Sequence, residues 1–157
     1  MSASKDYLVR LVAYDRIINA RLDKRRRLMA AATRTTSTMR DDGAQMGSGF
    51  HDKIGEKMSA IADLDKTVNF YTDVLADLTE DAMLLMGHME RRHRDVLYKR
   101  YIECKPLRQV QQEMGYRSYR GICKLHGRAL VEFEKLLETG GIKVLYWMPL
   151  PESPKEG

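Results

Sequence analysis

The sequence contains little cysteine and has no long apolar run. Cys104 and Cys123 are its only cysteines and lack CxxC spacing, so we expect reduced thiols and neither a disulfide scaffold nor a zinc site. No stretch approaches the roughly 20 apolar residues of a membrane span, and residues 1–10 lack the apolar core of a secretory signal. These absences predict a cytoplasmic protein with no membrane partner.

The residue patterns of common catalytic and metal sites are also missing. Residues 43–49 lack the Gly-Lys-Ser/Thr ending of a phosphate-binding loop. His88 and His93 are five residues apart, with no Cys or acidic ligands beside them in a metal-binding pattern. The acidic pairs at 41–42 and 80–81 are more simply solvated groups than an acid and base pair. We therefore expect no enzyme activity, no cofactor and no metal.

Positive charge is concentrated in one segment. The chain carries a net charge of +5, while residues 88–128 alone hold eight Arg and three Lys against four carboxylates, a net +7. The rest of the chain therefore sums to −2. Such a concentration is the electrostatic footprint that binding to DNA phosphate requires.

The N-terminal half shows two long helical patterns. Apolar residues recur at helical spacing over residues 4–33, and the composition over 33–52 then changes to Thr, Ser, Gly and Asp, which predicts a loop. A second helix is expected from about residue 52. Its apolar seam consists of Ile54, Met58, Ile61, Val68, Leu75, Leu78, Ala82 and Leu85. Two such helices should pair as an antiparallel hairpin over residues 1–87, for oligomerisation or partner contact. The basic run at 24–27 is interpreted as a solvated helix face, with a second nucleic-acid contact as the alternative.

Three shorter helices are expected in the C-terminal half, over residues 89–102, 107–114 and 118–138. Gly115 follows the second of them directly, where a helix end often takes positive φ. Ser118 is placed as the N-cap of the third helix and is also predicted to be a DNA-binding residue. The predicted fold is all-α, with a long helical hairpin followed by a three-helix helix-turn-helix domain over residues 88–138 and an extended tail over 139–157. Within that tail, the strand-forming residues 142–148 are expected to pack on the body or pair with another chain.

The third of these helices should have a core face and an exposed basic face. At about 100° per residue, one side collects Ile122, Leu125, Ala129, Leu130 and Phe133. The opposite side offers Arg120, Lys124 and Arg128, and Tyr119 lies on one flank; these four are the candidate DNA-reading residues. Arg108 and Arg117 flank the start of the helix and are predicted to contact phosphates. The alternative for the same pattern is a three-helix bundle whose basic face is merely solvated.

Three stretches of this half resemble a known family: Val96-Leu-Tyr-Lys-Arg-Tyr101, Leu107-Arg-Gln-Val-Gln-Gln-Glu-Met-Gly-Tyr116 and Ile122-Cys-Lys-Leu-His-Gly-Arg-Ala-Leu130. They resemble region 4 of bacterial sigma-70 factors. The whole layout, including the stretch Asp52-Lys-Ile-Gly55, is similar to small phage and prophage transcriptional regulators that end in such a region. The turn is one residue longer than in housekeeping sigma factors, and the promoter-melting regions have no counterpart.

The resemblance implies a phage-type activator of late genes in a bacterial host cytoplasm. Its partners would be double-stranded DNA and RNA polymerase, and a homo-oligomer is expected, with a dimer favoured. A different interpretation is a small-terminase-like subunit that recognises DNA for packaging, which would assemble as a ring. A third is a protein-binding adaptor that never meets DNA.

Overall fold

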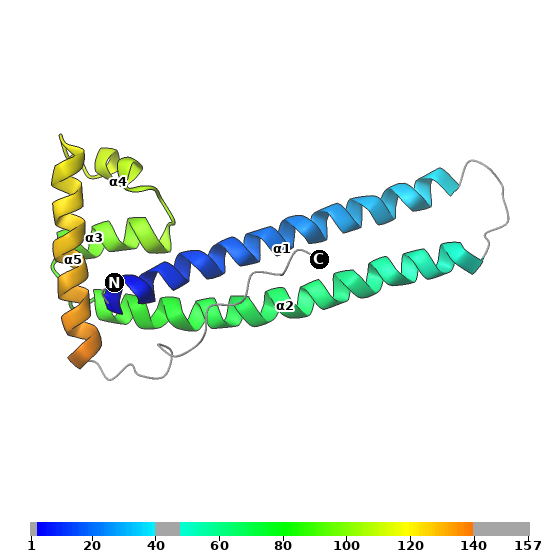
Figure 1. Ribbon diagram of the computed structural model, residues 1–157, viewed down its shortest axis with the longest axis horizontal. Coiled ribbons are helices and arrows are strands. Elements are labelled where there is room, and N and C mark those ends of the chain that lie inside the picture. The colour runs from blue at the N-terminus through cyan, green and yellow to red at the C-terminus, as the bar shows by residue number, and fades with distance from the viewer. Residues whose placement is uncertain (1–2, 40–47, 140–157) are drawn as a thin grey trace. The chain divides into compact units, whose positions relative to one another are not determined.

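The computed structural model describes residues 3–39 and 48–139, with side chains described over 3–34 and 52–139. The elements, shown in Figure 1, are α1 (Ala3–Met39), α2 (Ser48–Met86), α3 (Arg91–Leu97), the π-helix η1 (Tyr98–Ile102), α4 (Leu107–Glu113) and α5 (Tyr119–Thr139). These described residues contain no strand, so the predicted all-α class is confirmed for them.

The first two helices extend further than predicted. α1 continues to Met39 and α2 begins at Ser48, whereas the predicted loop covered 33–52. A Ser or Thr costs a helix at most about 0.7 kcal/mol relative to Ala, so a long helix can continue through several of them. Within the helix, the Thr33 hydroxyl donates to the Met29 carbonyl at 2.9 Å. Residues 40–47, and the predicted tail and strand beyond Thr139, lie outside the described residues.

The chain divides into two compact units whose limits differ from the predicted boundary at residues 87 and 88. Unit 1 comprises Met1–Asp15 and Val74–Gly157, and unit 2 comprises Arg16–Asp73. The start of α1 and the end of α2 therefore belong with the C-terminal helices.

Unit 1 contains most of the buried apolar side chains described. The Tyr7 hydroxyl donates to the Leu78 carbonyl at 3.1 Å, and the Tyr7 ring centroid lies 5.8 Å from that of Phe133 on α5. These contacts tie residues from three distant parts of the sequence into one core. They explain why the helix ends group with the C-terminal segment: their apolar side chains are buried against it.

Unit 2 is a pair of helical segments with a thin core. Arg25 Nε lies 2.6 Å from Asp65 Oδ1, and the Arg21 guanidinium lies 4.8 Å above the Tyr71 ring, so the segments run antiparallel. Among side chains 16–34 and 52–73, Ile61 is the only buried apolar one. Met58, predicted in the seam, is instead 53% exposed. Two helices alone can cover only one stripe of each other, so an apolar residue beside that stripe stays in water.

The predicted helix over 89–102 is divided in the structure. α3 ends at Leu97 and the chain continues as η1, in which the Glu103 N–H donates to the Tyr98 carbonyl at 3.0 Å. Such a bond spans five residues, one more than in an α-helix. Cys104 then takes a positive φ of 55°, which ends the π-helix. The pattern of apolar residues contained no sign of this wider turn.

Candidate nucleic-acid interface

The connection between α4 and α5 has the geometry that its residues predict. Gly115 has a φ of +73°, its N–H donates to the Gln112 carbonyl at 3.2 Å, and the Tyr116 N–H donates to the Gln111 carbonyl at 3.0 Å. This pair of bonds is the Schellman motif, in which a glycine terminates the helix in the left-handed region. The predicted role of Gly115 is confirmed.

The start of α5 is capped by a side chain. The Ser118 Oγ accepts a hydrogen bond from the Gly121 N–H at 3.1 Å, as an N-cap serine does. A Cβ on Gly121 would lie 3.1 Å from that oxygen and 3.3 Å from the Tyr116 ring, so a residue with no side chain suits this position. Ser118 was predicted both as the cap and as a DNA-binding residue, and its hydroxyl is engaged in the cap.

The two faces of α5 are those predicted from periodicity. Ile122, Ala129 and Phe133 are fully buried and Leu125 is 8% exposed, although Leu130 is only half-buried. The predicted DNA-binding residues are all exposed: Arg108 on α4, Arg117 and Ser118 in the turn, and Tyr119, Arg120, Lys124 and Arg128 on α5. Arg120, Lys124 and Arg128 follow one another at four-residue spacing, so they share one side of the helix.

This exposed face carries positive charge without compensation. The sequence has no acidic residue between Glu113 and Glu132. Within the described part of the chain, no ion pair with a carboxylate is formed by Arg108, Arg117, Arg120, Lys124 or Arg128. A ridge of unpaired cations on a capped helix can bind phosphate and donate hydrogen bonds to guanine edges.

One contact joins α4 to this face. The Arg108 guanidinium carbon lies 4.5 Å from the centroid of the Tyr119 ring, within the range of a cation–π interaction. The structure thus brings together two predicted site residues that are 11 positions apart in the sequence. Helical periodicity, which treats each helix separately, contained no information on this pairing.

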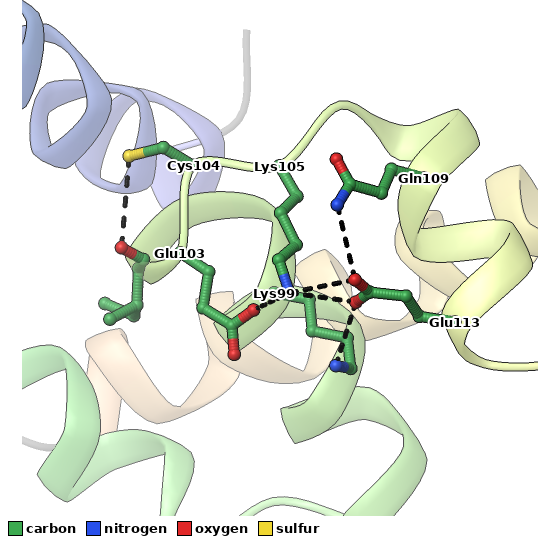
Figure 2. Close-up of polar contacts among 7 residues, drawn as sticks. Lys99, Glu103, Cys104, Lys105, Gln109 and Glu113 are labelled. Atoms are coloured by element: carbon green, nitrogen blue, oxygen red, sulfur yellow. Dashed lines mark hydrogen bonds and ion pairs between the residues drawn. The ribbon is translucent and has the colours of Figure 1, made fainter.

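A polar cluster, shown in Figure 2, holds α4 against η1 and the loop after it. Lys99 and Lys105 each place Nζ 3.0 Å from carboxylate oxygens of Glu113, and Gln109 donates to the same carboxylate at 3.3 Å. Lys105 also pairs with Glu103. Hydrogen bonds from Lys105 and then Lys99 lower the pKa of Glu113 from 4.5 to about 2. Glu113 is therefore ionised at neutral pH and links three parts of the chain.

The sequence-based interpretation missed two histidine contacts. His126 Nε2 lies 2.8 Å from the Tyr101 hydroxyl, and the two rings stack at 5.7 Å. Burial, followed by the charges of Arg100 and Lys5, lowers the pKa of His126 to about 4. His93 contacts Glu132, which also accepts the Glu90 N–H at 3.1 Å. No sequence motif marks either pair, because the partners are 25 and 39 residues apart.

A concave surface adjoins the turn at Arg117. Its volume is about 520 Å³, and its charged walls are Arg92, Lys99 and Arg117 together with Asp95 and Glu113. The surface next to the turn therefore carries charge of both signs, unlike the exposed face of α5. No group of three or more His, Cys, Asp or Glu side chains suited to a metal occurs among the residues that the structure describes. In the same part of the chain, no helix is both long and apolar enough to cross a membrane.

Comparisons with models of known families, with characterised proteins and with solved structures gave no match.

Proposed function

We propose that this chain is a sequence-specific DNA-binding transcriptional regulator of phage or prophage type, which activates late genes by recruiting RNA polymerase. In this proposal residues 88–138 form a sigma-region-4-like helix-turn-helix domain, with α4 and α5 as the two helices of the motif. Residues 1–87 form a helical hairpin whose role is self-association or contact with the polymerase.

The observation that carries the proposal is the exposed face of α5. Arg120, Lys124 and Arg128 are exposed on one side of a helix whose opposite side is buried, and none of them is paired with a carboxylate of the described chain. A recognition helix needs a fixed core side and a free side of this kind to enter a major groove. Arg117, at the start of the helix, would contact the DNA backbone.

DNA binding can be tested by fluorescence anisotropy on a labelled duplex selected from a random library by the wild-type chain. We expect Arg120→Ala with Lys124→Ala to weaken binding by about 1–3 kcal/mol for each base that the removed side chains read. A matched control replaces the exposed Lys53 and Lys66 of α2, which removes the same charge elsewhere. If both double variants bind as tightly as the wild type, α5 does not read DNA. If the wild type binds neither the library nor heparin at low salt, the adaptor function is favoured.

A small-terminase-like packaging subunit is the second candidate function. Four large apolar side chains of unit 2 are at least 39% exposed, and such side chains suit assembly into an oligomer. They are Leu22, Met29, Met58 and Phe70. Light scattering of the purified chain separates the two candidates. A monomer or dimer supports the regulator, whereas a ring of about eight or more subunits supports packaging.

A further inference from the structure

Arg108 and Tyr119 each lie in the first turn of a helix. Arg108 is the second residue of α4, Tyr119 is the first residue of α5, and the guanidinium lies over the ring at 4.5 Å. Tyr119 is 41% exposed, and Arg108 is exposed as well. The pair therefore lies on the surface, at the N-terminus of α5, the helix that we propose to read DNA.

The pairing limits where the Arg108 side chain can be. An exposed arginine ordinarily samples many rotamers, and a cation–π contact at an exposed site favours one position by about two- to fivefold. A guanidinium that lies over a ring still has N–H donors at its edge, in a planar fork that matches a phosphate. Lys99 and Lys105 are engaged by Glu113, but Arg108 has no carboxylate partner in the described residues. Its donors remain available to an external anion.

The same pairing changes the expected role of Tyr119. Arg108 covers one face of the ring, so that face is closed to a base or a thymine methyl group. The sequence alone predicted Tyr119 as a residue that docks in the groove. The geometry instead gives its ring a use within the protein, as the support for a cation that comes from α4.

We infer that Tyr119 is a positioning residue, whose ring holds the Arg108 guanidinium where it contacts a backbone phosphate of the bound duplex. This inference rests on the proposed DNA binding and assigns a role within it. Arg108 and Tyr119 then make one contact together, which is independent of base sequence. Arg120, Lys124 and Arg128 supply the sequence-dependent contacts.

The experiment is a double-mutant cycle with Arg108→Ala, Tyr119→Leu and the two combined. Affinity is measured by anisotropy on a mixed-sequence duplex and on the selected duplex, between about 50 and 200 mM salt. Log affinity falls as log salt rises, and removing one phosphate contact makes this negative slope shallower by about 0.9. We expect Arg108→Ala to make the slope shallower by this amount and Tyr119→Leu to make it shallower by part of this amount. The combined variant should be no weaker than Arg108→Ala alone, and each reduction should be equal on the two duplexes.

Two control variants distinguish positioning from other roles. Tyr119→Phe keeps the ring and should bind as the wild type does, whereas loss of binding in this variant would assign the role to the hydroxyl. The fold losses of DNA affinity caused by Arg117→Ala and by Tyr119→Leu should multiply in the combined variant, because Arg117 makes a separate contact. Thermal unfolding followed by circular dichroism checks that each variant is folded.

The possible outcomes separate this inference from the proposed function. If the fold losses of affinity caused by Arg108→Ala and Tyr119→Leu multiply in the combined variant, or if Tyr119→Leu weakens binding only to the selected duplex, Tyr119 does not position Arg108. The proposed DNA binding would stand in either case. If the wild-type chain binds neither duplex, both the inference and the proposed function are wrong.

Discussion

His126 shows how strongly a single residue depends on neighbours that are distant in the sequence. Its ring is largely buried in unit 1, and Tyr101 Oη lies 2.8 Å from Nε2. With a pKa near 4, the imidazole is neutral at pH 7, and its Nε2 can accept a hydrogen bond from the proton of the Tyr101 hydroxyl. Burial also raises the pKa of Tyr101, so the phenol keeps this proton. Tyr101 and His126 therefore form a hydrogen bond between two uncharged side chains, within a segment of the chain that is rich in basic residues.

The lowered pKa predicts how stability changes in mild acid. An unfolded histidine titrates near 6.5 and the folded one near 4, so the unfolded chain binds more protons between these values. The contribution of His126 is complete above about pH 6.5 and disappears as the pH falls towards 4, at less than the limiting ~1.4 kcal/mol per pH unit because the ring is partly solvated.

Urea unfolding at several pH values should show this dependence. It should weaken in His126→Gln, which retains an acceptor but does not titrate. His88→Gln, at an exposed position, should not change it. Equal slopes in the wild type and His126→Gln would contradict the assigned pKa.

At the scale of elements, the connection between α4 and α5 is specified by local chemistry. A left-handed glycine ends one helix, a serine caps the next, and four residues from Met114 to Arg117 separate α4 from that cap. The Glu113 cluster then ties the end of α4 to η1. Together with the buried side chains of α5, these contacts fix the orientation of its exposed basic face.

Two glycine substitutions should have opposite effects on stability. Gly115→Ala forces an L-residue into φ +73° and should cost about 1–2 kcal/mol. Gly127→Ala adds a methyl group that meets nothing within 4 Å in the interior of α5, and should stabilise the protein by about 0.5–1 kcal/mol. Chemical unfolding measures both. Gly115→Asn should recover part of the stability, because Asn tolerates the left-handed region, and a neutral Gly115→Ala would show that the turn can rearrange.

At the scale of the whole molecule, burial is distributed unevenly. Among the described side chains, unit 1 contains all the buried apolar residues except Ile61. Local opening requires least free energy where it exposes little buried apolar surface. Unit 2 should therefore open more readily than unit 1, which would leave its surfaces available to a partner.

Hydrogen exchange measured by mass spectrometry should show this difference. We expect amides of residues 16–34 and 52–73 to exchange faster than those around Phe133 at low protein concentration. Phe133→Ala, at a fully buried position, should cost about 3–5 kcal/mol. Phe70→Ala, at a position 58% exposed, should change stability by less than about 0.5 kcal/mol. Equal protection of both units at the lowest concentration would contradict the expectation.

The sequence alone was enough for features that depend on neighbours within a few residues. The helical class, the helix over 118–138, the glycine stop and the serine cap were predicted, because periodicity and capping act within one or two turns. Exposure of Arg120, Lys124 and Arg128 followed from the same periodicity. The predicted end of α1 near residue 33 and the predicted start of α2 near residue 52 were less accurate, because differences in helix propensity between the residues there are small.

Tertiary structure decided which distant residues meet. The pairs Tyr101–His126 and Arg108–Tyr119 join residues from separate elements, as does the grouping of the start of α1 and the end of α2 with α5. Each depends on how side chains from different helices fill one space, and a one-dimensional pattern does not contain that information. The sequence by itself thus determined that the exposed face of α5 is basic, whereas the position of Arg108 over Tyr119 depends on the packing of α4 against α5.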